Sequence, residues 1–188
     1  MKRSAGVLMP ISSLPSKYGI GTLGKGARDF IDFLEKSGQT YWQVLPIGPT
    51  GYGDSPYQSF SSNAGNPYFI DLDDLCDEGY LEKEEYVNEN YGTDVNCVDY
   101  AQIYNTRFTV LRKAVERLSA VQTEDYLSFL RDNAYWLNDY ALFMAEKDDH
   151  KGQAYTTWEE DIRKHDTKTL ENEKVRLQKN VEFYLGLQ

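Results

Sequence analysis

The sequence predicts an α/β protein that begins with a strand, a helix and a second strand and then becomes largely helical. Two short apolar segments, residues 6–9 and 41–47, flank an amphipathic segment at 25–37. A helix of this length between two strands makes a right-handed crossover, so the strands should be parallel. After Leu72 the apolar residues recur at helical spacing. We therefore expect a β/α start followed by a helical insertion.

The first helix is predicted by the spacing of its apolar residues, which recur three or four positions apart on one face: Ala27, Phe30, Ile31 and Leu34. Gly38 should end this helix, because glycine readily adopts the left-handed conformation found after a last helical turn. The apolar run 41–45 that follows reads as a buried strand.

Further helices are predicted over 100–118, 124–146 and 167–184. The helix at 100–118 has a stripe in which one charged residue occurs: Tyr100, Ile103, Tyr104, Arg107, Phe108, Leu111, Val115 and Leu118. The acidic stretch 73–90, broken by Gly79, should form surface turns and a short helix. We divide the chain into a β/α start at 1–72, a helical insertion at 73–160, and a helix at 161–188 that returns to the β/α part.

Composition excludes several classes of protein. The net charge of −10 disfavours nucleic acid and anionic membrane surfaces as partners, because both attract clustered lysine and arginine. No apolar run approaches the ~20 residues needed to cross a bilayer, and Pro10 and Pro15 interrupt the one segment that resembles a signal peptide. Cys76 and Cys97 form no disulfide framework or metal motif; one bridge between them stays open, but two reduced thiols suit the cytoplasmic location that we expect.

The loop over 46–60 is the most informative part of the chain. Its glycines and prolines should hold one backbone shape that displays Tyr52 and Tyr57, with Asp54 and Ser55 between them. Flat apolar rings beside hydroxyl and carboxylate groups, with no positive charge, suit a neutral, ring-shaped, hydroxyl-rich ligand such as a sugar. In the alternative interpretation, the two rings pack the loop onto the strand ends, Asp54 caps nearby N–H groups and Ser55 makes a local turn.

The same residues resemble a known family. The runs at 6–15, 41–46, 48–59, 64–68 and 70–72 are similar to the signature of the 4-α-glucanotransferases, also called amylomaltases or disproportionating enzymes. The resemblance implies the first strands of a (β/α)8 TIM barrel and a retaining transfer of α-1,4-glucan segments between maltooligosaccharides, without metal or cofactor. It also implies that Tyr57 lines the subsite of the sugar whose bond is cut, and that Tyr52 belongs to an additional glucan-binding surface.

The resemblance also sets an expectation about catalysis. Such a barrel needs ~250 residues, and this chain has 188, many of them in the insertion, so we expect an incomplete barrel with unpaired edges that favour self-association. The family's nucleophile, acid/base and third acid lie at the ends of later strands, and no position here matches their motifs. We therefore expect no catalytic residues in this chain and no activity alone. A non-catalytic glucan-binding or structural chain is the alternative, and an intact hydrolase would require a carboxylate pair that we do not find.

Other motifs have simpler explanations. The run Gly19–Gly24 matches G-x-G-x-x-G, but the preceding loop is too long for a dinucleotide site and the second strand does not end in an acid. Asp71, Asp73 and Asp74 form an acidic cluster that reads as a solvated turn. We expect His150 and His165 at the surface, and Trp158 to be a packing residue.

Overall fold

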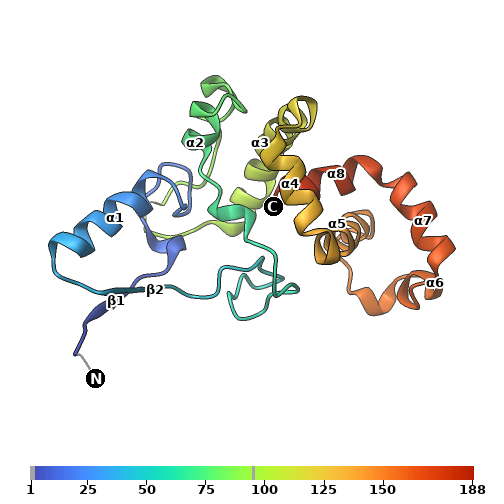
Figure 1. Cartoon of the computed structure of the whole chain (residues 1–188), viewed down its shortest axis with the longest axis horizontal. Coiled ribbons are helices and arrows are strands. Elements are labelled where there is room, and N and C mark those ends of the chain that lie inside the picture. Colours follow the sequence, from blue (N-terminus) through green and yellow to red (C-terminus); the bar gives the residue numbers. More distant parts are fainter. Residues whose placement is uncertain (1–2, 95) are drawn as a thin grey trace. The chain divides into compact units, whose positions relative to one another are not determined.

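The computed structural model describes residues 3–94 and 96–188 and divides the chain into two compact units, Met1–Ala114 and Val115–Gln188. The division falls inside helix α3, Tyr100–Val121. The described residues are mostly helical, with two parallel strands (Figure 1). The division at residues 72 and 160 that the sequence suggested stays a prediction.

The two strands confirm the predicted parallel pairing. Strand β1, Gly6–Leu8, pairs with β2, Tyr41–Gln43, and Val7 lies opposite Trp42 in the register. The prediction of a buried strand over 41–45 was wrong, because β2 ends at Gln43 and Tyr41 is 63% exposed. Burial of a strand requires layers packed against both of its faces, and in each strand only the middle residue, Val7 or Trp42, is partly buried.

Helix α1, Lys25–Lys36, lies beside the strand pair, as Figure 1 shows. The ring of Phe30 meets the indole of Trp42 edge-on at 5.2 Å between centroids. A small core forms here from Ile11, Leu14 and Ala27 with Met9, Phe30, Trp42 and Phe69 packed against it. The helix ends as predicted, since Gly38 has φ +69° in the left-handed region.

The rest of the first unit is built from loops, short helices and the start of α3. Helix α2, Leu72–Asp77, is followed by Gly79 at φ +83°, which confirms a short helix and a turn in the acidic stretch. Helix α3 confirms the predicted stripe over most of its length, with Ile103, Leu111 and Val115 buried. Short 3₁₀ turns occupy Ile11–Ser13, Pro67–Phe69 and Lys83–Glu85.

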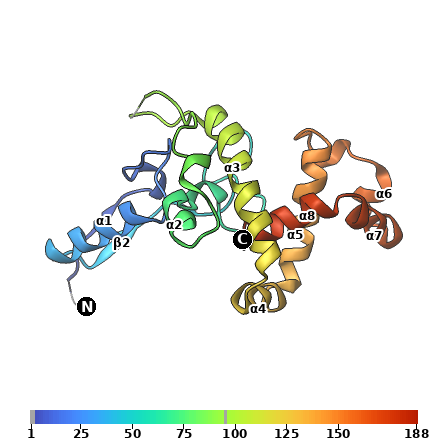
Figure 2. The same cartoon turned by 90° about the horizontal axis from the view of Figure 1, so that it is seen from above.

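The second unit contains five more helices, seen from above in Figure 2: α4 (Glu124–Asp132), α5 (Ala134–Asp149), α6 (Glu160–Arg163), α7 (Thr167–Arg176) and α8 (Gln178–Gly186). A 3₁₀ turn at Tyr155–Thr157 lies between α5 and α6. Helix α8 packs along α5. Within the described ranges, no helix is long and apolar enough to cross a membrane.

Two helices that the sequence predicted as continuous are each broken once. Asn133 separates α4 from α5, and its side chain donates to the Phe129 carbonyl and accepts from the Trp136 indole. Local side-chain bonds of this kind compete with the helical ladder. Leu177, with φ −100° and ψ 15°, separates α7 from α8. The apolar periodicity continues through both breaks, so it did not reveal them.

Candidate functional site

The loop after β2 is held in shape by its own hydrogen bonds. Thr50 and Ser59 form an isolated antiparallel bridge that closes the loop at its base. At the tip, Gly53 and Asp54 both have positive φ, and the Asp54 amide donates to the Gly51 carbonyl at 3.1 Å. An aspartate tolerates this conformation better than most residues. The tip therefore has a defined turn.

Tyr52 and Tyr57 point out of this loop into solvent. Tyr52 is fully exposed at 105%, and Tyr57 is 73% exposed. Neither ring packs the loop against the strand ends in this structure. The rings of Tyr52 and Tyr57 are therefore both accessible to a ligand.

Asp54 and Ser55 lie closer to the body of the protein and are half-buried. Asp54 lines a cavity of about 40 Å³ near the ends of both strands, together with Thr50, Asn66 and Tyr100. Partial burial raises the pKa of Asp54. Burial, followed by the Asp54 charge, raises the pKa of Tyr100 as well. The Ser55 hydroxyl accepts a long bond of 3.4 Å from the Tyr57 amide, so it has capacity left for another partner.

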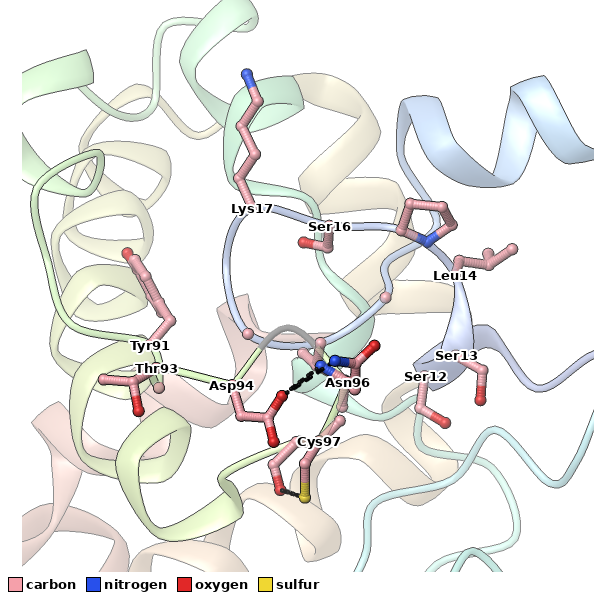
Figure 3. A pocket seen from close by; sticks show the side chains of 16 residues that line it. Ser12, Ser13, Leu14, Ser16, Lys17, Tyr91, Thr93, Asp94, Asn96 and Cys97 are labelled. Carbon is pink, nitrogen blue, oxygen red and sulfur yellow. Dashed lines mark hydrogen bonds between the residues drawn. The ribbon is translucent and has the colours of Figure 1, made fainter.

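A larger hollow of about 600 Å³ lies between the loop after β1 and the residues 91–94 and 96–98 (Figure 3). Ser12 and Ser13 lie on one side, and Asp94 and Cys97 lie on the other, while Lys17 extends away from them. None of the four residues proposed from the sequence lines this hollow. The sequence offered one signal for it, the Ser-, Pro- and Gly-rich composition of residues 11–22, which is typical of exposed loops.

The acidic cluster Asp71, Asp73 and Asp74, at the start of α2, has a structural role. Asp71 caps α2 by accepting from the amides of Asp73 and Asp74, and it also accepts from the Thr22 hydroxyl. Asp74 forms a two-point ion pair with Arg28. These carboxylates connect α2 to the loop residue Thr22 and to α1, so the interpretation as a merely solvated turn was incomplete.

Asp73 accepts hydrogen bonds from two tyrosines. The hydroxyls of Tyr18 and Tyr86 reach its Oδ1 at 2.7 and 2.8 Å. The two rings meet edge-on, and Tyr91 packs against Tyr18 in the same way. These three buried rings account for part of the high tyrosine content.

The glycine motif at 19–24 serves close packing. Gly19 has φ +80°, and a side chain on Gly21 would meet the Ile11 carbonyl oxygen at 2.0 Å. The loop therefore needs glycine for backbone reasons that involve no nucleotide.

A separate ionic cluster lies in the second unit around Glu146, whose side chain is 2% exposed. The Arg176 Nη2 atom lies 2.8 Å from Asp149, 2.5 Å from Glu173 and 3.8 Å from Glu146. Burial, followed by the neighbouring charge of Glu173, raises the pKa of Glu146 to about 7. The prediction that His150 lies at the surface was wrong. Its side chain is only 15% exposed, because it stacks on Trp158 with ring centroids 4.8 Å apart.

Glu146, Asp149 and His150 have the donor types and proximity that a metal ion requires. Two contacts argue against this use. The Arg176 guanidinium already supplies the positive charge between the carboxylates, and His150 Nδ1 is bonded to the Glu146 carbonyl while Nε2 is bonded to Glu159. The cluster is an ion network with its own cation. His165 is exposed and Trp158 buried, as predicted, and Cys76 and Cys97 are free thiols.

The fold matches part of a known class of carbohydrate enzymes. The amylomaltase from Streptococcus agalactiae in complex with acarbose superposes with a TM-score of 0.94 at 39% identity, covering 100% of this chain and 38% of that one. A family model described as 4-alpha-glucanotransferase matches residues 9–188. The chain belongs to the 4-α-glucanotransferase family, as its sequence indicated.

Two sequence relatives support the same assignment. The 4-alpha-glucanotransferase of Clostridium butyricum is 47% identical over 180 residues, which cover 96% of this chain and 37% of that protein. The enzyme named likewise from Thermus thermophilus is 44% identical over 188 residues, covering 98% of this chain and 37% of its own. The chain thus spans little more than a third of the length of these relatives and corresponds to their N-terminal part.

Proposed function

We propose that this chain is the N-terminal portion of a 4-α-glucanotransferase and forms one wall of its glucan-binding cleft. The complete enzyme would transfer α-1,4-glucan segments between maltooligosaccharides with retention of configuration, in the cytoplasm. The observation that carries the proposal is the hydrogen-bonded turn after β2, which exposes Tyr52 and Tyr57 beside half-buried Asp54 and Ser55. The acarbose complex of the S. agalactiae relative supports a glucan-like ligand for the family.

In this proposal, Tyr57 stacks on the sugar next to the bond that is cut, and Tyr52 binds a more distant part of the glucan. Asp54 and Ser55 hydrogen-bond to sugar hydroxyls. A retaining mechanism needs two carboxyl groups about 5–5.5 Å apart, one as nucleophile and one as acid/base. The carboxylates of the acidic cluster, Asp71, Asp73 and Asp74, are committed to capping, tyrosine and arginine contacts. We therefore propose that the catalytic carboxylates belong to the part of the enzyme that this chain does not span.

The test uses the chain as it is. Titration with maltohexaose, followed by calorimetry, should show binding that saturates, and incubation with maltotriose should release no glucose and no longer oligomers. Release of glucose would contradict the proposed lack of catalytic groups. Absence of maltohexaose binding would contradict the proposed glucan-binding wall and favour the alternative of a structural chain.

A further inference from the structure

Arg107 is a buried cation that the proposed site does not explain. It lies on α3, and its side chain is 0% exposed between the buried residues Ile103 and Leu111. Burial lowers the pKa of Arg107 to about 10, and a nearby carboxylate, Asp71, acts in the opposite direction. Among the described residues no carboxylate lies within ion-pairing distance of this guanidinium. An arginine therefore stays charged inside the unit without a direct counter-ion.

The hydrogen bonds of Arg107 go to two backbone carbonyls. Nη1 donates to the Tyr18 carbonyl at 3.3 Å, and Nη2 donates to the Ile70 carbonyl. Its Nε atom is buried and has no hydrogen-bond partner among the described residues. Burying a cation in this way costs free energy, which only the two carbonyl contacts and packing can offset.

The two carbonyls belong to the two loops that follow the strands. Tyr18 lies in the loop after β1, between the Ser12–Ser13 segment and α1. Ile70 follows the 3₁₀ turn Pro67–Phe69, in the segment that leads from the tyrosine-bearing loop to α2. The two segments also meet directly, because the Leu23 amide donates to the Phe69 carbonyl at 2.9 Å. The Arg107 side chain thus connects both loop segments through their backbone carbonyls.

We infer that Arg107 is a positioning residue, which fixes the spacing between the loop after β1 and the loop that carries Tyr52 and Tyr57. The inference rests on the proposed glucan-binding function. The planar guanidinium holds two acceptors in a fixed relation, whereas a lysine ammonium is a single flexible donor group. Loss of the guanidinium removes the hydrogen bonds to both carbonyls and lets the two loop segments move relative to one another. The glucan-facing residues then lose their common geometry.

The test compares Arg107→Met, Arg107→Lys and the control Lys113→Met, which removes a partly exposed cation from the same helix. Maltohexaose affinity is measured at a temperature where circular dichroism shows each variant folded. Arg107→Met should lower the affinity at least tenfold, Arg107→Lys should recover part of it, and Lys113→Met should leave it unchanged. A role in stability alone would shift the thermal midpoint and leave the affinity of the folded protein unaltered, and that result would overturn the inference.

Amide hydrogen exchange provides a readout that does not depend on glucan binding. In Arg107→Met, exchange should accelerate in residues 12–23 and 66–71, including the Leu23 amide, and stay unchanged in residues 124–188. If the unmodified chain fails to bind maltohexaose, the proposed function fails, and exchange alone decides the role of Arg107. Unchanged exchange in both loop segments would overturn the inference whatever the result for glucan.

Discussion

Tyr57 is the residue at which the proposed binding role and a role in folding are most easily separated. Its ring is 73% exposed, on a loop whose form depends on backbone hydrogen bonds and on the positive φ of Gly53. An exposed ring contributes little to stability, because little apolar surface leaves water when the chain folds. The same ring offers a flat apolar face and a hydroxyl to a sugar. Its removal should therefore affect affinity far more than stability.

We predict that Tyr57→Ala lowers maltohexaose affinity by about tenfold or more, which corresponds to ~1.4 kcal/mol or more of lost binding energy. Tyr57→Phe keeps the ring face and should lose only a few-fold. Tyr135→Ala is the matched control, because this tyrosine is equally exposed but lies on α5 in the second unit. Calorimetric titration of the three variants checks the prediction. Equal affinity of Tyr57→Ala and the unmodified chain would show that this ring does not contact glucan.

The ionic cluster around Glu146 connects α5 and α7. Glu146, Asp149 and His150 come from the end of α5, Glu173 and Arg176 come from α7, and Glu159 precedes α6. The cluster has four carboxylates and two basic groups, so full ionisation leaves negative charge in excess. A proton on Glu146 relieves this excess, which agrees with the rise of its pKa to about 7 from an ordinary 4.5.

This protonation makes the stability of the second unit depend on pH. The folded state binds a proton at Glu146 more tightly than the unfolded state, so the stabilisation is complete below about pH 4.5 and is lost as the pH rises through about 7. For His150, burial opposes the charged form, but hydrogen bonds to Glu159 and to the Glu146 carbonyl outweigh it and raise the pKa, which adds a loss of the same sign. Asp149 and Glu159 have lowered pKa values, so their contribution is lost only at acid pH.

We predict that Glu146→Gln stabilises the protein at pH 8 by on the order of 1–3 kcal/mol and flattens the decline between pH 4.5 and 7. Glutamine keeps the shape of the side chain and can donate to Glu173 without bringing a charge. Thermal unfolding followed by circular dichroism at several pH values measures the effect. Glu116→Gln, on the exposed face of α3, is the control and should leave the pH profile unchanged. A Glu146→Gln profile parallel to that of the unmodified protein would contradict the prediction.

Elements whose stability depends on local pattern were predictable from the sequence. The spacing of apolar residues, together with Gly38, predicted α1. The apolar stripe over 100–118 predicted most of α3 and placed Arg107 on its buried face. The breaks at Asn133 and Leu177 were missed, because the apolar spacing runs through both. Asn133 breaks its helix through side-chain bonds that composition does not reveal.

The candidate glucan-binding site was predictable from the sequence only in the single loop that carries Tyr52 and Tyr57. The run 50–59 contains its own turn residues, so its defined shape followed from glycine and proline. The roles of Asp73 and Arg107 depend on partners 55 and 89 positions away in the chain, which no local pattern indicates. His150 was assigned to the surface from its polar neighbours, but the contact that buries it comes from Trp158 in a different segment. Long-range contacts set burial and charge pairing, and these are what the sequence alone did not show.

The strand pair exposes apolar side chains that barrel strands ordinarily bury. Leu8, Tyr41, Val44 and Ile47 are all exposed on or just after the two strands. In the part of the chain that the structure describes, each strand also has a free edge. Unpaired edges with apolar side chains favour pairing with another copy of the chain. This supports the expectation, drawn from the sequence, that the chain self-associates.

We predict that the purified chain forms larger species as its concentration rises, measured by size-exclusion chromatography with light scattering. Combining Leu8→Lys with Tyr41→Lys should shift the chain toward monomer, because charged side chains on strands prevent edge-to-edge contact. Val175→Lys adds a charge at an exposed apolar position of α7 and should leave association unchanged, which separates the effect of the strands from that of net charge. A chain that stays monomeric at every concentration would show that the exposed strand pair does not drive association. Association that responds equally to all three lysines would place its origin in overall charge and not in the strand edges.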